Sequence, residues 1–171
     1  MKRIAVLLGG LALAAAAAPV HAGELFGGLF VHDVDTPLTH SGIEEGLDVQ
    51  LGWRGGPIGR TPLQPYAYAA LNTAGETHYA AAGISAKFGG QVYVRPALGI
   101  GIHTGSSGDF QRSDKIAFGS RILFAPELGV GVQVNERVSV EASWVHMSHA
   151  QILSRQNPGI DNFGVRLNFA F

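Results

Sequence analysis

The chain contains no cysteine, few charged residues and, beyond its first 22 residues, no long apolar run. Without cysteine no disulfide can form, so the stability of the fold has to come from elsewhere. Because no later apolar run approaches the roughly 18 residues that a membrane-spanning helix needs, such a helix is not expected. Helical amphipathic periodicity is also missing. These absences leave two main possibilities, a soluble β-sandwich and a transmembrane β-barrel.

The N-terminus has the composition of an export signal. Lys2 and Arg3 precede an apolar run over residues 4–18, and Val20-His21-Ala22 resembles a small-residue cleavage site. We therefore predict that residues 1–22 are removed and that residues 23–171 form a single domain. Loss of Lys2 and Arg3 takes the net charge from −1 to about −3, which argues against a nucleic-acid partner.

Eight segments of the mature sequence carry strand signals and are separated by turn or loop composition. Most are near the roughly 9 to 11 residues that a tilted strand needs to cross a bilayer. The predicted strands cover residues 24–32, 46–54, 64–72, 79–88, 91–103, 119–134, 137–148 and 162–171.

Apolar residues alternate with polar residues or glycine in several of these segments, as expected when the two faces of a strand meet different surroundings. In 46–54, for example, Leu47, Val49 and Leu51 oppose Asp48 and Gln50. The faces of the first and third segments are not assigned. Charges on the polar face need partners in a narrow interior. We expect Asp48, Glu127 and Glu141 to pair there with Arg95, Arg121 and Arg166.

The connections between the predicted strands differ in length on the two sides of the sheet. Short turns occur at Gly89-Gly90 and Asn135-Glu136, whereas residues 33–45, 104–118 and 149–161 form long polar connections. Short turns on one side and long loops on the other are typical of outer-membrane barrels. The linker 55–63 is longer than such a turn usually is. The terminal Phe171 also resembles the C-terminal signal of these barrels. We predict an all-β fold, an eight-stranded antiparallel transmembrane barrel of the Gram-negative outer membrane.

Four aromatic residues could form girdles at the membrane interfaces, although core packing is an equal alternative for the two tyrosines. They are Trp53, Trp144, Tyr66 and Tyr68.

The segment 137–148 breaks its own pattern, because its apolar face continues into His146 and Ser148. Residues i and i+2 of a strand share a face, so the imidazole can accept the hydroxyl proton and activate Ser148 as a nucleophile. Asp161 has the parity of Phe163 and is expected at the start of the neighbouring strand, where it can orient the imidazole. The sequence therefore predicts a serine-hydrolase triad on the lipid face.

The topology of the barrel predicts the depth of this triad in the membrane. With periplasmic termini, the strand over 137–148 runs outward, so the three residues meet the outer leaflet. That leaflet consists of lipopolysaccharide, which suggests an acyl ester of its lipid anchor as the substrate.

His146-Met147-Ser148, followed by Asn157-Pro158-Gly159-Ile160-Asp161 and a final alternating strand, resembles the signature of the lipid A 3-O-deacylase family (PagL type). The resemblance implies an eight-stranded outer-membrane barrel that removes the 3-O-linked hydroxyacyl chain of lipid A without a cofactor or metal. It also implies His146 as base, Ser148 as nucleophile and Asp161 as acid.

The same resemblance assigns oxyanion binding or substrate positioning to Asn157, Gly159 and the residue after the nucleophile. That residue is His149 here, where the family often has Asn, and the acid is Asp161 where the family often has Glu. The shorter acid requires a closer approach to the imidazole, and His149 is expected to alter how the acyl carbonyl is held.

Other interpretations remain open at the level of sequence. A metal pair of His146 and His149 lacks further ligands at a recognisable spacing. A non-catalytic adhesive or structural barrel would use its long loops, and a phospholipase or acyltransferase could use the same dyad. The sequence also leaves open whether the barrel forms a homodimer.

Overall fold

The computed structural model describes residues 23–39, 42–108 and 114–171, so the predicted export signal lies outside the described residues. No helix in this part of the chain is long and apolar enough to cross a membrane. The strands are β1 (Gly23–Val31), β2 (Leu47–Gly55), β3 (Leu63–Asn72), β4 (Tyr79–Ala86), β5 (Phe88–Gly89), β6 (Val92–His103), β7 (Ile122–Gln133), β8 (Val138–Met147) and β9 (Ile160–Ala170).

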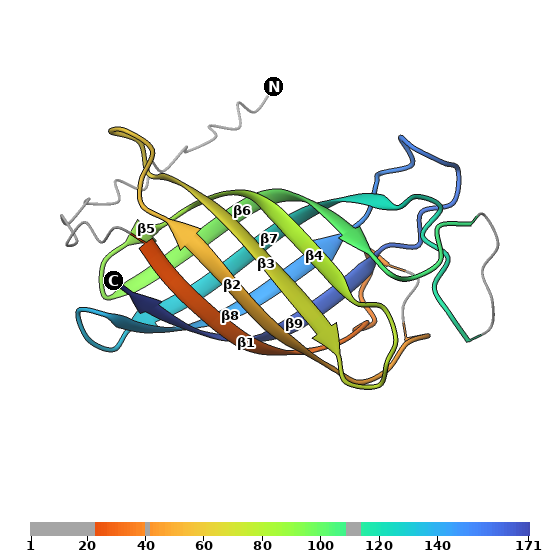
Figure 1. Ribbon diagram of the computed structural model, residues 1–171, viewed down its shortest axis with the longest axis horizontal. Helices are drawn as coiled ribbons and strands as arrows, with labels where there is room; N and C mark the ends of the chain where they lie inside the picture. The colour runs from red at the N-terminus through yellow and green to blue at the C-terminus, as the bar shows by residue number, and fades with distance from the viewer. Residues whose placement is uncertain (1–22, 40–41, 109–113) are drawn as a thin grey trace, which may run out of the picture.

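All strand pairings are antiparallel, and they close into a ring. The order around the sheet is β4-β3-β2-β1-β9-β8-β7-β6-β5, and β4 also pairs with β6 (Figure 1). Because β4 and β5 both pair with β6 along one line, they act as a single interrupted strand, and the barrel has eight strands. The predicted eight-stranded antiparallel barrel is confirmed.

Pro96 accounts for the interruption between β4 and β5. The pairs Ser85↔Ala97 and Phe88↔Val94 keep one register, and Pro96 lies on β6 between them. Proline has no backbone N–H, so it cannot donate to the ladder at that point. The wall of the barrel is therefore locally broken beside Pro96.

The two ends of the barrel differ as the sequence predicted. The long connections β1–β2, β6–β7 and β8–β9 lie at one end, and the shorter turns β7–β8 and β5–β6 lie at the other (Figure 1). β1 begins and β9 ends at the short-turn end, where the Phe171 N–H donates to the Gly23 carbonyl over 3.0 Å.

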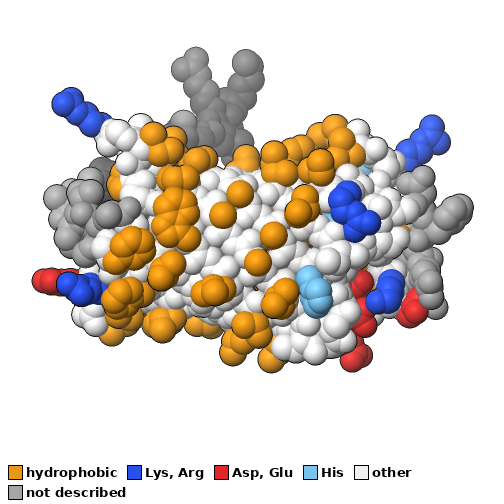
Figure 2. Space-filling view, in the orientation of Figure 1, with side chains coloured by type: hydrophobic (Ala, Val, Ile, Leu, Met, Phe, Trp, Pro, Cys, Tyr) orange, Lys and Arg blue, Asp and Glu red, His pale blue; other side chains and the backbone are white. Residues whose placement is uncertain are grey.

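The alternation of residues sorts side chains between the interior and the outer wall. In β2 the side chains of Leu47, Val49 and Leu51 are exposed, whereas Asp48 and Gln50 are buried. The same pattern runs through β6, β7 and β9, as predicted. Apolar side chains are spread over the wall between the two ends in Figure 2.

The interior contains the aromatic side chains that the sequence left unassigned. Tyr66 and Tyr68 are buried and stack with ring centroids 6.0 Å apart. Phe26 meets Tyr68 edge-on at 6.3 Å. Both tyrosines are therefore core residues, whereas Trp53 is exposed on the outer wall.

A network of ion pairs fills the rest of the interior. Arg166 contacts Glu127 at 2.6 Å and Glu141 at 3.6 Å, and Arg95 lies 3.3 Å from Glu141. These predicted partners are confirmed. Glu24, on a strand whose faces were not assigned, extends the network, since its carboxylate contacts Arg54 at 2.7 Å and Arg95 at 3.0 Å.

Two of the expected ion-pair partners were wrong. Asp48 bonds to His32 instead of an arginine, because it lies at the long-loop end of β2, where His32 follows β1. Arg121 precedes β7, and its guanidinium donates to the backbone carbonyls of His103 and Gly105. Both residues lie beyond the level of the internal network.

Replacing Arg166 with leucine is expected to lower the free energy of unfolding by about 3–5 kcal/mol, because Glu127 and Glu141 would lose a buried cation. The measurement is urea unfolding of the refolded barrel in lipid vesicles. Arg60→Leu, in the exposed β2–β3 turn, is the control and should change stability by less than about 0.5 kcal/mol. Equal unfolding midpoints for the two variants would contradict a stabilising network.

Candidate active site

The outer face of β8 ends in a histidine and a serine that are hydrogen-bonded to each other. His146 Nε2 lies 2.9 Å from Ser148 Oγ. Ser148 follows β8 directly and is fixed by two backbone hydrogen bonds with Phe124 of β7, at 2.7 and 3.1 Å. Both side chains are half-buried on the outward wall. The hydroxyl is therefore held in position for proton transfer to the imidazole.

Asp161 completes this chain of contacts from the neighbouring strand. It pairs with His146 across the β8–β9 ladder, and its Oδ1 lies 2.9 Å from His146 Nδ1. The acid is fully buried, although it has the outward parity of Phe163. When Nδ1–H donates to the carboxylate, Nε2 is left to accept the Ser148 proton. The three residues predicted from the sequence thus lie together in the order that nucleophilic catalysis requires.

Two further side chains hold the acid, and sequence reasoning missed both. Trp144 Nε1 donates to Asp161 Oδ1 over 2.7 Å, and Thr36 Oγ1 donates to Asp161 Oδ2. The parity of Trp144, two residues before His146, was a usable signal, but an indole on a lipid face is ordinarily an interfacial anchor. Thr36 is 125 residues away in sequence, and no local pattern marks it.

The β1–β2 connection brings Thr36 to the acid and is itself pinned to the barrel. The Val34 N–H donates to the Asp161 carbonyl over 2.8 Å. Asp33 Oδ2 accepts the N–H groups of Ile43 and Glu44 at 2.8 and 2.9 Å. The connection is thus closed on itself beside the catalytic candidates.

A buried histidine anchors the same connection. His32 Nδ1 lies 2.9 Å from Asp48, and its Nε2 lies 3.2 Å from Glu44. Burial lowers the pKa of His32, but the hydrogen bonds to Asp48 and Glu44 outweigh it and raise this pKa to about 9. Burial raises the pKa of Glu44, whereas hydrogen bonds from His32 and Thr77 and from the Ile116 backbone lower it to about 2.

The three residues assigned to oxyanion binding or positioning lie close to the triad in different ways. The imidazole of His149 is fully buried, and its Nε2 lies 2.9 Å from the Phe118 carbonyl and 2.8 Å from the Gln156 carbonyl. The His149 N–H donates to Asn157 Oδ1 over 2.8 Å. The ring of His149 therefore ties the β8–β9 connection to the β6–β7 connection, to which Phe118 belongs.

Gly159 lies against the imidazole of His146. Its φ of 69° is in the left-handed region, which favours glycine. A Cβ at this position would lie 3.3 Å from His146 Cε1 and 3.2 Å from Thr39 Cγ2. The glycine thus gives the imidazole room beside the β1–β2 connection.

Among residues 23–39, 42–108 and 114–171, there is no group of three or more His, Cys, Asp or Glu side chains that could hold a metal ion.

A row of outward-facing residues connects the triad to a groove in the barrel wall. Ile84 pairs with Leu98, and Leu98 pairs with Pro126. Pro126 faces His146, because it lies between the paired positions Phe124↔Ser148 and Glu127↔Val145. Neighbouring strands are about 4.8 Å apart, so Leu98 lies roughly 10 Å from His146 along this row.

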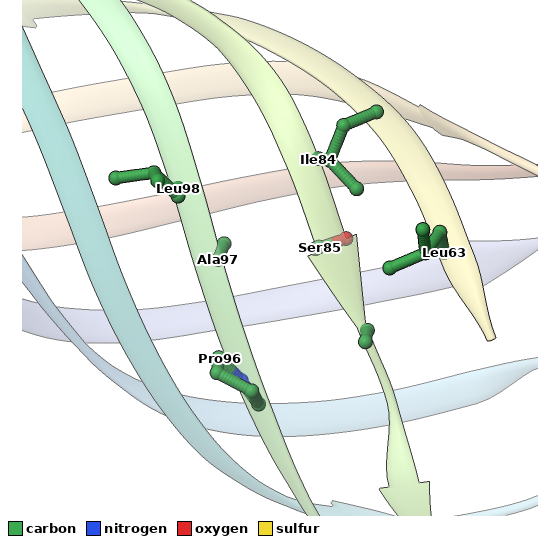
Figure 3. Close-up of a pocket in the computed structure, with 7 residues that line it drawn as sticks. Leu63, Ile84, Ser85, Pro96, Ala97 and Leu98 are labelled. Carbon is green, nitrogen blue, oxygen red and sulfur yellow. The ribbon is translucent and has the colours of Figure 1, made fainter.

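The groove itself has a volume of about 320 Å³ and lies beside Pro96, where the ladder is interrupted between β4 and β5 (Figure 3). It is open to the outer wall, where Leu63, Ile84 and Leu98 are exposed. Its lining residues are Leu63, Ile84, Ser85, Ala86, Pro96, Ala97 and Leu98.

Comparison with known proteins gives one family and several solved structures. Residues 46–170 match the family described as Lipid A 3-O-deacylase (PagL). The crystal structure of the outer membrane enzyme PagL has a TM-score of 0.62 and 19% identity, over 86% of this chain and 99% of that one. The crystal structure of Neisserial surface protein A (NspA) has a TM-score of 0.53 and 10% identity, over 88% and 97%. No curated protein matches in sequence.

The β1–β2 connection is expected to lose stability as the pH rises from 6.5 through about 9. The folded pKa of His32 lies above its ordinary value, so its contribution is fully present below pH 6.5 and disappears when the folded form deprotonates. The melting temperature of the barrel, followed by circular dichroism, should fall over this range. His32→Gln should remove this fall, and an unchanged pH dependence in the variant would contradict the assignment to His32.

Proposed function

The chain belongs to the lipid A 3-O-deacylase (PagL) family, and on that premise we propose that it is a serine esterase that hydrolyses the 3-O-linked hydroxyacyl ester of lipid A. The protein is a β-barrel of the outer membrane. One observation carries the proposal, namely the hydrogen-bonded chain Ser148–His146–Asp161 on the outward wall at the long-loop end. An ester of an outer-leaflet lipid can reach a nucleophile at that depth without leaving the membrane.

The first chemical step forms an acyl-enzyme. His146 Nε2 accepts the Ser148 proton while Oγ forms a bond to the ester carbonyl carbon. The bond between the acyl carbon and the 3-oxygen of the sugar then breaks, and the proton on Nε2 passes to this leaving oxygen. Asp161 keeps Nδ1–H oriented and stabilises the imidazolium between these transfers.

A water molecule completes the reaction. Nε2 takes a proton from the water as its oxygen attacks the acyl carbonyl, and the proton returns to Ser148 Oγ as that bond breaks. The products are a free hydroxy fatty acid and lipid A with a 3-hydroxyl group. Every proton is carried by groups of this chain or by water, and the scheme uses no cofactor.

Asn157 is the side chain that we assign to the oxyanion. Its Oδ1 accepts the His149 N–H over 2.8 Å, and this contact fixes which end of the amide is oxygen. The same contact occupies the backbone N–H next to the nucleophile, which in many esterases would bind the oxyanion. The NH₂ group of Asn157 is thus the donor on the β8–β9 connection that we assign to the developing charge.

The apolar wall offers a course for the acyl chain. Ser148 lies beside the exposed Phe124, and the row through Pro126 and Leu98 leads to the groove beside Pro96. An acyl chain laid along this row would exchange contact with neighbouring lipids for contact with the protein, which helps to hold the ester near the nucleophile.

Lipid A mass spectrometry tests the reaction. Cells expressing the wild type should lose the 3-O-linked hydroxyacyl mass, whereas Ser148→Ala and His146→Ala should reduce turnover by at least about a thousandfold. Ser107→Ala, in the β6–β7 connection, is the matched control and should retain activity. Unchanged acylation by a folded wild type, on lipid A that carries the 3-linked chain, would refute the proposal. Phospholipid supplied in parallel separates the phospholipase and acyltransferase alternatives.

Trp144→Phe is expected to lower kcat/KM by about tenfold, because Asp161 loses the hydrogen bond that fixes its orientation toward His146, while an aromatic side chain remains. The charge left on the carboxylate then stabilises the imidazolium more strongly, so the acidic limb of the pH–rate profile should move to higher pH. Thr36→Val should act in the same direction, and Thr36→Ser should restore the wild-type profile. A lower rate with an unmoved pH profile would mean that these residues only support the fold.

A further inference from the structure

The β8–β9 connection, residues 148–159, carries two adjacent apolar side chains on its surface. Ile152 is 70% exposed and Leu153 is 53% exposed. No other large apolar side chain in the described residues is more exposed than Ile152, including those of the outer wall. Their neighbours Gln151 and Arg155 are also exposed, so the pair is not the edge of an internal core.

The backbone holds this pair in place at a conformational cost. Ala150 and Gln151 have φ values of 51° and 58°, and two consecutive non-glycine residues rarely adopt the left-handed region. The turn starts at His149, whose ring is buried, and the Ile152 N–H donates to the His149 carbonyl over 2.9 Å. A strained turn that displays apolar side chains suggests that their exposure is used.

The connection extends sideways as well as beyond the end of the barrel. In Figure 1 the blue β8–β9 connection extends beyond the long-loop end of the barrel, and part of it rises above the level of the upper edge of the wall. It begins at Ser148, whose outward neighbours Ile122 and Phe124 belong to the exposed apolar wall. The pair therefore begins only four residues beyond Ser148, where the chain leaves the lipid-facing wall.

We propose that Ile152 and Leu153 form an interfacial anchor that inserts into the outer-leaflet lipid surface beside Ser148. The occupant is lipid, because the pair follows the lipid-facing wall within a few residues of the chain and the exposed Arg155, two residues further on, suits anionic headgroups. The anchor sets the depth at which the surrounding glycolipid lies relative to Ser148. Its consequence for catalysis rests on the proposed esterase function, whereas the insertion itself does not.

Site-directed spin labelling tests the insertion, and the absence of native cysteine gives a clean background. Ile152→Cys is labelled with a nitroxide in vesicles of lipopolysaccharide and phospholipid. References are Leu98→Cys on the apolar wall and Lys115→Cys in the exposed β6–β7 connection. We expect the label at position 152 to be at least about fivefold less accessible than that at position 115 to a water-soluble nickel chelate, and accessible to oxygen as at position 98.

Two results would overturn the anchor. One is nickel accessibility at position 152 equal to that at position 115, which would place the pair in water. The other is protection accompanied by spin–spin broadening that disappears on dilution with unlabelled barrel, which would place a second copy of the chain on the pair.

A kinetic arm measures the consequence. The double variant Ile152→Ser with Leu153→Ser should deacylate lipid A in vesicles about tenfold more slowly and hydrolyse a water-soluble short-chain ester at the wild-type rate. The electrophoretic mobility of the unheated barrel checks that the variant is folded. An unchanged vesicle rate would overturn the catalytic consequence. If the wild type does not deacylate lipid A at all, the proposed function fails, and the spin-label measurement still decides the anchor.

Discussion

Closure of the sheet is the constraint on which the rest of the structure depends. Because β4 pairs with β6, the ring of strands closes, and backbone groups pair between neighbouring strands except beside Pro96, where the ladder is interrupted between β4 and β5. A closed ring gives each side chain only two destinations, the interior or the outer wall. His146 and Ser148 share the outward parity of the apolar residues of β8. The alternation that makes the outer wall apolar therefore also places these two side chains on the side that faces the membrane.

The interior of the barrel is narrow, because eight strands enclose little space, and many of its side chains are charged. Glu24 lies between Arg54 and Arg95, and Arg166 lies between Glu127 and Glu141, so that buried charges have partners of opposite sign. Small residues make room for the large ones. A Cβ on Gly131 would lie 2.3 Å from Tyr93 Cζ. Gly131 therefore leaves the Tyr93 ring its space in the narrow interior.

The site combines rigid and irregular structure. The β8–β9 ladder sets the approach of His146 to Asp161, and the β1–β2 connection covers the acid with Thr36. An aspartate is one methylene shorter than the glutamate that the family often uses, and here direct cross-strand pairing brings it within 2.9 Å of the imidazole. The indole of Trp144 supplies a second donor on the same oxygen. The ring of His149 braces the connection on which Asn157 lies.

The sequence by itself determined the class of fold, the faces of most strands and the shared parity of His146, Ser148 and Asp161, because a period of two is a local property that any stretch of strand displays. It did not determine the partners of Asp48 or Arg121, the contribution of Glu24, or the contact of Thr36 with the acid. Those depend on the register between strands and on how connections fold back over the rim. These contacts join residues between 16 and 125 positions apart in the chain, and only the closed tertiary structure decides which of them meet.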